Sequence, residues 1–336
     1  MIPFPAGQTA PLLFLMGPTA SGKSELALRL GERFAAAGHG AMEILNADSV
    51  QLYRGLEIGS AKPSAEELSR LPHHLLDLTD PGEPFSADRY RLAALDVIAD
   101  CHKRGVLPML VGGSGLYFRA VEKGLAPVPP VPEEILEGIR AEARLKGWEV
   151  LHQRLLQVDP AWGARVTPRD AQRIGRGLSV FQATGTPLSE WCQQQDQGPR
   201  FPILKLAITC PRERLYPRIE ARFDWMMAHG LLEEVTSLHA QGHDRGLPAM
   251  KAVGYRQLFR HLDGEISLEE AISLAKRDSR RYAKRQMTWL RREPGLIFLG
   301  DSPLKEALAR VVDFLDSQAY DKESGGNLVH PGTTPL

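Results

Sequence analysis

Two spacings of apolar residues alternate along the first 125 residues and predict a sheet covered by helices. Apolar runs, which are typical of buried parallel strands, occur at 12–16 and 106–111, and a further strand is expected at 42–46. Apolar residues at helical spacing predict helices at 25–37 and 85–104, the second with an inward face of Tyr90, Leu92, Leu95, Ile98 and Ala99. A further short strand is expected at 74–78. This order predicts an α/β fold with a parallel-sheet core.

A change of pattern after residue 125 predicts a second domain inserted into the first. The proline-rich stretch 126–132 suits neither helix nor central strand, so we place a domain boundary there. Helical spacing then predicts helices at 133–146, 148–158 and 170–184, and a polar linker follows at 193–199. The sheet resumes at 203–208, followed by helices at 212–241 and 267–292 and a strand at 296–299. We therefore predict core segments at 1–125 and 200–317, a helical insertion at 126–199 and a disordered tail at 318–336.

Composition and charge are those of an ordinary soluble globular protein. The 336 residues are 43% hydrophobic and 24% charged, and 41 lysines and arginines balance 41 aspartates and glutamates. Because the chain is neutral, any binding of nucleic acid has to come from a local patch. Three widely spaced cysteines indicate free thiols and a cytoplasmic protein. The N-terminal apolar run is too short for a signal peptide or a membrane span, and a monomer is the default expectation.

The stretch between the first expected strand and the first helix matches the phosphate-loop pattern G-x-x-x-x-G-K-[ST]. Its residues are Gly17, Pro18, Thr19, Ala20, Ser21, Gly22, Lys23 and Ser24. In this context, backbone N–H groups and a helix N-terminus form a concavity for a polyphosphate. Lys23 would reach the outer phosphate oxygens, and the Ser24 hydroxyl would bind Mg²⁺. The pattern does not specify which phosphate compound is bound.

Two more segments are expected at the same edge of the sheet. Asp48 follows the strand at 42–46, and the glycines 112, 113 and 115 follow the strand at 106–111. Ligands of open α/β sheets bind at the carboxyl ends of the strands, so Asp48 should lie near the phosphate loop. There its carboxylate could assist a metal or act as a general base, and an Asx turn is the alternative. His73 and His74 show no metal-ligand spacing and are interpreted as polar residues at a loop or strand end.

Basic residues gather on two of the expected helices. Three arginines four residues apart share one helix face, where they could clamp a phosphate or lie on a solvated surface: Arg214, Arg218 and Arg222. In the segment 276–292, eight of seventeen residues are basic and only Asp278 is acidic. Solvated charged helices usually alternate in sign, so this segment favours contact with the phosphate backbone of a nucleic acid.

The motifs, taken in order, resemble those of the tRNA dimethylallyltransferase family, whose members are also called tRNA isopentenyltransferases. Each motif occurs elsewhere, but the ordered set is specific and extends from Gly17 to about Arg292. Besides the phosphate loop, the matching stretches are Asp48–Tyr53, Ile58–Pro63, Gly112–Tyr117, Gln172–Arg176, Ala252–Gln257 and Ala283–Trp289. The departures are small. Ser60 and Ser114 stand where the family commonly has Thr, and Gly177 should weaken its helix by about 1 kcal/mol.

The resemblance implies a P-loop nucleoside-triphosphatase-like core and a prenyl transfer. The phosphate loop would hold dimethylallyl diphosphate rather than ATP. The acceptor would be N6 of the adenosine 3′-adjacent to the anticodon, in tRNAs that read codons beginning with U. The implied catalytic residues are Lys23, Asp48 as the base, Ser114, and Arg222 as the diphosphate clamp with Arg218 as second choice. Ser24 would be the protein ligand of Mg²⁺.

The resemblance also implies contacts with tRNA. The target base would leave the anticodon-loop stack, and the helical insertion would hold the anticodon stem-loop. The implied contact residues are Asp48, Ser49, Val50, Gln51, Ser114, Gln172, Arg173, Ile174, Gly175, Arg176, Met250, Lys251, Ala252, Val253, Gly254, Tyr255, Lys284, Arg285, Gln286, Met287, Thr288, Trp289, Leu290 and Arg291.

Three other functions are compatible with parts of the pattern. An ATP-dependent small-molecule kinase would use the loop and the sheet but leave the insertion and the basic helix without a role. An enzyme that prenylates free AMP would not need the long basic helix. An RNA-binding P-loop NTPase would use Asp48 only to hold Mg²⁺.

Overall fold

The computed structural model describes residues 10–194 and 201–324, and the chain forms two compact units. One unit consists of Met1–Val121 and Arg200–Leu336, and the other of Glu122–Pro199. In the sequence, the smaller unit therefore interrupts the larger one.

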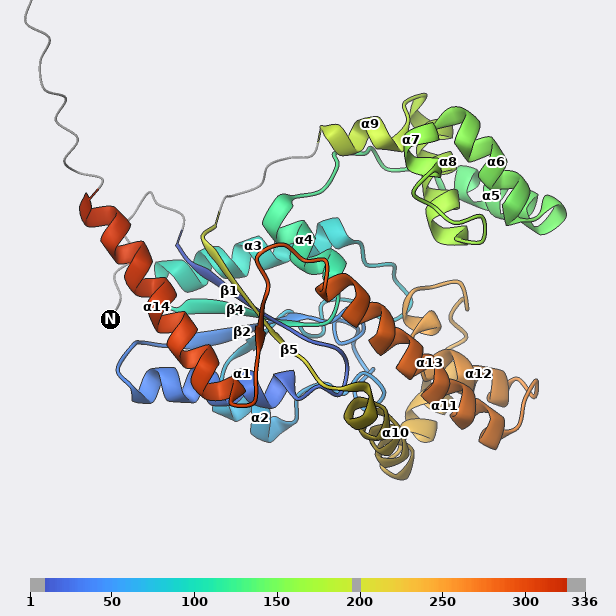
Figure 1. The fold of residues 1–336 in the computed structure, drawn as a ribbon. Coiled ribbons are helices and arrows are strands. Elements are labelled where there is room, and N and C mark those ends of the chain that lie inside the picture. The colour runs from blue at the N-terminus through green and yellow to red at the C-terminus, as the bar shows by residue number, and fades with distance from the viewer. Residues whose placement is uncertain (1–9, 195–200, 325–336) are drawn as a thin grey trace, which may run out of the picture. The chain divides into compact units, whose positions relative to one another are not determined.

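A six-stranded parallel sheet forms the centre of the larger unit (Figure 1). In spatial order its strands are β3 (His73–His74), β2 (Met42–Ala47), β4 (Leu107–Gly112), β1 (Leu12–Met16), β5 (Ile203–Ile208) and β6 (Ile297–Leu299). Every neighbouring pair runs parallel. Because β1 lies between β4 and β5, segments on both sides of the smaller unit share one sheet. The predicted α/β fold with a parallel-sheet core is confirmed.

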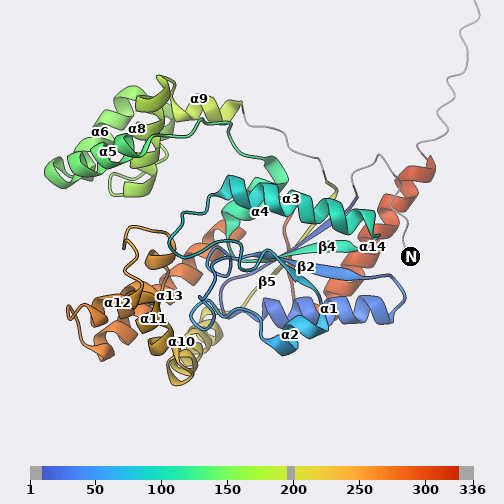
Figure 2. The same cartoon turned by 180° about the vertical axis from the view of Figure 1, so that it is seen from behind.

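Alternate residues of the central strand β1 belong to two separate hydrophobic cores. Leu12, Phe14 and Met16 lie in one core, and Leu13 and Leu15 lie in the other. The two opposite views show helices on both faces of the sheet (Figures 1 and 2). The first core includes residues of α3 (Ala87–Lys103) and α4 (Gly115–Lys123), and the second includes residues of α1 (Lys23–Ala36) and α14 (Pro303–Ser324). Burial on both faces explains the mainly apolar sequences of the strands, and each fully buried Leu or Phe contributes about 1.5–3 kcal/mol.

A second group of helices shares the first core with the loop that follows β2. These helices are α10 (Arg212–Ala228), α11 (Leu231–Ala240), α12 (Tyr255–Leu262) and α13 (Leu268–Leu290), with a short 3₁₀ turn, η1 (Ala249–Lys251), before α12. Leu52, Tyr53 and Leu56 of the β2 loop are buried in that core. The short α2 (Ala65–Arg70) follows this loop and is capped by Ser64, whose side chain and backbone both bond Glu67. The helix group therefore fixes the loop that carries Asp48.

The smaller unit is entirely helical in its described part. It contains α5 (Glu133–Lys146), α6 (Trp148–Val158), α7 (Pro160–Gly163), α8 (Ala171–Thr184) and α9 (Leu188–Gln193). Ile139, Leu151, Leu155 and Ile174 are buried in its core. Gly177 lies where a Cβ would approach side-chain atoms of Leu155 and Trp162 to 2.7 and 2.9 Å. Gly177 is therefore needed for close packing of α8, which offsets its low helix propensity.

Some expectations from the sequence are wrong in detail. The strand expected at 74–78 is only the two-residue β3, because Leu75 and Asp77 adopt left-handed backbone and turn the chain. Leu92 and Ala99, both expected to face inward on α3, are exposed, and Ala94 is buried instead. The expected disordered tail begins inside α14, which continues to Ser324. The rest of that tail, 325–336, lies outside the described residues, as do residues 195–199 of the expected linker.

Candidate functional site

The phosphate loop connects β1 to the first turn of α1. Ala20 and Gly22 adopt left-handed backbone, with φ of 60° and 91°, and Gly22 is the N-cap of α1. Alternation of left- and right-handed residues directs successive N–H groups into one concavity, which attracts anions. The Ser21 hydroxyl is buried and lacks a hydrogen-bond partner among the described residues. A phosphate oxygen would supply an acceptor for that hydroxyl.

Lys23 lies in this loop, and its surroundings lower its pKa. Burial lowers its pKa to about 8, Asp48 acts in the opposite direction, and the positive charge of Arg222 lowers the pKa further. The ammonium Nζ lies 3.4 Å from Pro18 O. A buried ammonium is stabilised when an anion replaces its lost hydration. The loop is therefore poised to bind a polyanion.

Asp48 follows β2 and its carboxylate has two roles. Val50 N–H donates to its Oδ1 at 2.9 Å, so the Asx turn considered from the sequence does form. Asn46 connects the Asp48 backbone to the segment after β3, since its Oδ1 accepts Asp48 N–H and its Nδ2 donates to Leu75 O at 3.1 Å. The carboxylate also interacts electrostatically with Lys23 and Arg222. The structure thus brings Asp48 to the phosphate loop, as expected.

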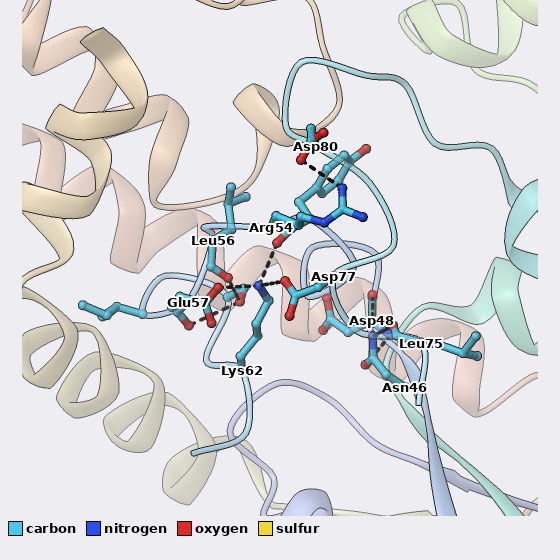
Figure 3. A network of polar contacts seen from close by, with 12 residues as sticks. Asn46, Asp48, Arg54, Leu56, Glu57, Lys62, Leu75, Asp77 and Asp80 are labelled. Atoms are coloured by element: carbon cyan, nitrogen blue, oxygen red, sulfur yellow. Dashed lines mark hydrogen bonds and ion pairs between the residues drawn. The ribbon is translucent and has the colours of Figure 1, made fainter. Parts of the chain in front are cut away.

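Lys62 clamps the loop that follows Asp48 (Figure 3). Its Nζ donates to Tyr53 O at 2.8 Å, to Glu57 Oε1 at 2.6 Å and to Asp77 Oδ1 at 2.5 Å. The lysine side chain is 4% exposed, whereas both carboxylates are about half exposed. In the same loop, Gln51 Nε2 donates to the backbone oxygens of residues 60 and 61. These hydrogen bonds connect the motif stretches 48–53 and 58–63 to each other.

Arg222 is the arginine of α10 that faces the site. It is half-buried, whereas Arg214 and Arg218 are exposed. Burial lowers its pKa, and the charges of Asp48 and Glu67 act in the opposite direction. The electrostatic contact of Arg222 with both Lys23 and Asp48 favours it over Arg218 as the second cation of this site.

The loop after β4 is packed tightly against α13. A Cβ at Gly113 would lie 2.1 Å from Gln286 Nε2, and one at Gly115 would lie 2.8 Å from the ring of Trp289. Between these glycines, the Ser114 hydroxyl accepts Ser49 N–H at 3.1 Å. Ser114 is thus brought beside the Asp48 segment. The glycines are explained by this close approach of the helix.

Sequence reasoning missed Glu234 of α11, which organises a second motif. Its Oε2 accepts the N–H groups of Glu57 and Ile58, and its Oε1 accepts Gly59 N–H at 3.1 Å and the Tyr255 hydroxyl at 2.6 Å. A Cβ at Gly59 would lie 2.6 Å from the Tyr255 ring. Burial and Glu234 together raise the pKa of Tyr255 well above its usual value. The motif residues Gly59 and Tyr255 therefore both contact Glu234. Glu234 lies 175 positions after Gly59 in the sequence.

Comparison with known proteins assigns the family. The model of the family described as IPP transferase matches residues 51–293. The chain belongs to the IPP transferase family. A tRNA dimethylallyltransferase from Magnetococcus marinus is 54% identical over 297 residues, covering 87% of this chain and 95% of that protein. One from Geobacter sulfurreducens is 47% identical over 292 residues, covering 87% and 92%.

Solved structures of similar proteins agree with the fold. The full-length tRNA isopentenylpyrophosphate transferase of Bacillus halodurans matches with a TM-score of 0.68 at 34% identity, covering 93% of this chain and 99% of that one. A eukaryotic dimethylallyltransferase acting on tRNA matches with a TM-score of 0.75 at 24% identity, covering 92% and 80%, and this likeness concerns the fold alone. The family confirms the predicted transferase and the resemblance seen in the motifs. It does not support the kinase or NTPase alternatives.

In this IPP transferase, acidic partners neutralise part of the basic helix α13. Lys276 pairs with Asp224 of α10 at 2.5 Å, and Arg280 pairs with Glu220 of the same helix. Within the described part of the chain, four exposed cations on or just after α13 make no ion pair: Lys284, Arg285, Arg291 and Arg292. These four residues form what we call the basic surface.

The structure separates the tRNA-contact residues implied by the resemblance into exposed and buried side chains. In the smaller unit, Gln172, Arg173 and Arg176 lie exposed on α8, whereas Ile174 is buried. In the larger unit, exposed side chains belong to Lys251, Lys284, Arg285, Thr288 and Arg291. Buried side chains belong to Met250, Tyr255, Gln286 and Leu290, and intermediate ones include Ala252, Val253, Met287 and Trp289. The buried members support the fold rather than form a surface.

The Ser24 hydroxyl fits a Mg²⁺ site better than the one cluster with three metal-ligand atoms found among the described residues. Ser24 is exposed in the first turn of α1, where its oxygen and phosphate oxygens would suit Mg²⁺. The cluster consists of Glu43, His74 and Cys101. Both Glu43 oxygens, however, accept from Arg104 at 2.6 Å, which lowers the Glu43 pKa to about 2. The cluster is a buried ion-pair network, in line with the interpretation of His74 as a polar strand-end residue.

No helix in the described ranges has the length and apolar character that crossing a membrane requires.

Proposed function

We propose that this protein transfers the dimethylallyl group of dimethylallyl diphosphate to N6 of the adenosine 3′-adjacent to the anticodon, in tRNAs that read codons beginning with U. One observation carries the proposal: a phosphate loop, a carboxylate and a second cation meet at the carboxyl edge of the sheet in an IPP transferase family member. Lys23, Asp48 and Arg222 are these groups. Family membership supplies the class of reaction.

The loop and its cations would hold the leaving group. N–H groups at the end of the loop and the start of α1, together with Lys23 and Arg222, would surround the diphosphate oxygens, where negative charge grows as the C–O bond to the allylic carbon breaks. Mg²⁺ bound through the Ser24 hydroxyl would add positive charge to the same oxygens. Lys23 and Arg222 are both partly removed from water, so their charges act in a medium that screens them weakly. Diphosphate leaves with the electron pair of the broken bond.

Asp48 would accept the proton of the acceptor amine. The N6 lone pair of adenine is delocalised into the ring, so the amine is a weak nucleophile until its proton is removed. As the new N–C bond forms, the N6 proton becomes acidic and passes to the Asp48 carboxylate. Oδ1 is engaged by Val50 N–H, which leaves Oδ2 to take this proton. Ser114, which anchors the Ser49 backbone, would keep this carboxylate positioned to reach the N6 amine of the adenine.

The RNA would bind through exposed cations of both units. The basic surface on α13 and the exposed Gln172, Arg173 and Arg176 of α8 offer donors for backbone phosphates. The helical insertion at 126–199 would contact the anticodon stem-loop, and the target base would leave its stack to reach Asp48. We further propose that the enzyme acts as a cytoplasmic monomer.

Mass analysis of modified nucleosides tests the proposal. The protein is incubated with unmodified tRNA and Mg²⁺, with either dimethylallyl diphosphate or ATP, and the RNA is digested to nucleosides. A prenyl-sized mass gain on adenosine that depends on the diphosphate is expected. Free AMP serves as the competing acceptor, and prenylation of AMP but not of tRNA would refute the choice of acceptor. ATP consumption without a mass gain would refute the transfer itself.

A further inference from the structure

A buried glutamine of α13 joins three distant parts of the chain. Gln286 lies on the most basic helix of the protein, yet it is 2% exposed. Its Oε1 accepts Thr19 N–H at 2.9 Å, and its Nε2 donates to Gly113 O at 3.1 Å. One side-chain amide therefore bridges the phosphate loop, the loop after β4 and α13.

We propose that Gln286 is a positioning residue for diphosphate binding, which holds the phosphate loop in its anion-binding shape and does not itself contact RNA. The inference rests on the proposed function, because it takes the phosphate loop to be the diphosphate site. It replaces the RNA contact that the motif resemblance implied for this residue.

The conformation of the loop shows why it needs this partner. Thr19 precedes Ala20, whose φ of 60° is unfavourable for a residue with a Cβ. The bond from Thr19 N–H to Gln286 engages that amide and fixes the peptide next to the strained residue. Without an acceptor at Gln286, the loop would be free to relax at Ala20, and the remaining N–H groups would lose their common direction.

The other end of the amide is equally constrained. A Cβ at Gly113 would lie 2.1 Å from Gln286 Nε2, so glycine is required for the amide to reach Gly113 O. The next residue, Ser114, accepts Ser49 N–H and thereby contacts the segment that carries Asp48. Gln286 thus fixes the position of the phosphate loop relative to the segment that carries Asp48.

Only a neutral amide serves both ends of this bridge. The Thr19 end needs an acceptor and the Gly113 end needs a donor, and glutamine supplies one of each. A glutamate would place a second acceptor against Gly113 O, and a methionine of similar volume would offer neither group. Tyr282, one turn earlier on α13, also hydrogen-bonds to Gln286, so the amide is held from its own helix as well.

A double-mutant cycle on the full chain tests the assignment. The variants are Gln286→Ala, Gly113→Ala and their combination, with Gln286→Met as a volume-preserving form and Ser273→Ala, an exposed α13 position, as the control. Calorimetry measures the affinity for inorganic diphosphate with Mg²⁺ in the absence of tRNA. A filter assay measures tRNA affinity, and thermal unfolding checks the fold.

We expect Gln286→Ala, Gln286→Met and Gly113→Ala each to weaken diphosphate binding by about ten-fold, since each removes the same bridge. KM for dimethylallyl diphosphate should rise in parallel, and tRNA affinity should change by less than about two-fold. In the Gln286→Ala background, Gly113→Ala should cost little more, because the amide that its methyl would displace is already gone.

Two results would overturn the inference. One is wild-type diphosphate affinity together with weakened tRNA binding in both Gln286 variants, which would return the residue to RNA contact. The other is full additivity in the cycle, which would show that Gly113 and Gln286 act separately. If the unmodified protein failed to bind diphosphate at all, the proposed function would be refuted instead, and the two failures are thus distinguishable.

Discussion

Lys23, Asp48 and Arg222 together carry one positive charge in excess when no ligand is bound and Lys23 is protonated. Asp48 offsets one cation, while burial and the repulsion between Lys23 and Arg222 keep the pKa of Lys23 at about 8. A bound diphosphate would reverse this balance, since it brings several negative charges to both cations. The free protein therefore holds its site in a state that binding of the anion relieves.

This balance predicts a pH dependence of ligand binding. Only protonated Lys23 attracts diphosphate, so affinity should be insensitive to this group below its pKa of about 8. Above that pH, a proton has to be taken up on binding, and affinity should fall by up to about ten-fold per pH unit. Calorimetry over a pH series measures this, with Lys23→Met as the control because it lacks the titrating group. An equal decline in both proteins would contradict the assignment.

At the residue scale, local motifs could be predicted and their long-range partners could not. The phosphate loop and Asp48 were found because strand, glycine turn and helix follow one another within a few residues. Glu234 and Gln286 were missed as organising residues, since their partners lie 175 and 267 positions away. A glutamine on a strongly basic helix also suggests a surface, whereas the structure buries it against two glycine-rich loops.

At the scale of elements, the loop after β2 depends on a charged clamp rather than on apolar packing alone. Lys62 joins Tyr53 O, Glu57 and Asp77, and its own side chain is nearly inaccessible to water. Loss of one member of such a buried network leaves polar groups without partners. The clamp therefore couples the stability of the loop to the position of Asp48.

Replacement of Lys62 tests this coupling. Lys62→Met should lower the free energy of unfolding by about 1–3 kcal/mol and reduce the rate of transfer. Arg54→Met is the matched control in the same loop, because the Arg54–Asp80 pair is 3.0 Å long but more than half exposed on both sides. It should change stability by less than about 1 kcal/mol. Urea unfolding and single-turnover rates measure both effects, and equal stability of the two variants would rule out the clamp.

The basic surface makes a second prediction at this scale. Each cation on an RNA phosphate releases a counterion, so the combined change of Lys284, Arg285 and Arg291 to Gln should lower the slope of log affinity against log salt by about 2. The control removes a charge pair, with Lys276→Gln and Asp224→Asn together, because these two residues already neutralise each other. Filter binding across a salt series gives the slopes. An unchanged slope in the triple variant would show that this surface does not bind the RNA.

Strong patterns made most elements predictable, and weak ones explain the misses. The helices at 133–146 and 148–158 and the strand at 203–208 begin and end where the apolar spacing places them. The strand expected at 74–78 failed because apolar content does not report the left-handed backbone of Leu75 and Asp77. The helix α14 was not expected, and only its last residues, from 318, were assigned to a disordered tail; its inner face packs with α1 in the second core.

At the scale of the whole molecule, the proposed chemistry lies within one unit and part of the proposed RNA contact lies in the other. The larger unit supplies the phosphate loop, Asp48, Arg222 and α13, and the smaller unit supplies the exposed face of α8. The pairing of β5 with β1 shows how a chain interrupted by some 78 residues still completes one sheet. The apolar run at 203–208 made that return predictable.

The central claim is that Asp48 removes the N6 proton during transfer to tRNA, and Asp48→Asn tests it most directly. The amide keeps an oxygen for Val50 N–H and so preserves the Asx turn, but it cannot accept the proton. Loss of a negative charge beside Lys23 and Arg222 should leave diphosphate binding intact or tighten it. The measurement is single-turnover transfer with both substrates saturating. We predict a rate at least about 100-fold below wild type with tRNA affinity unchanged; a wild-type rate would contradict the account.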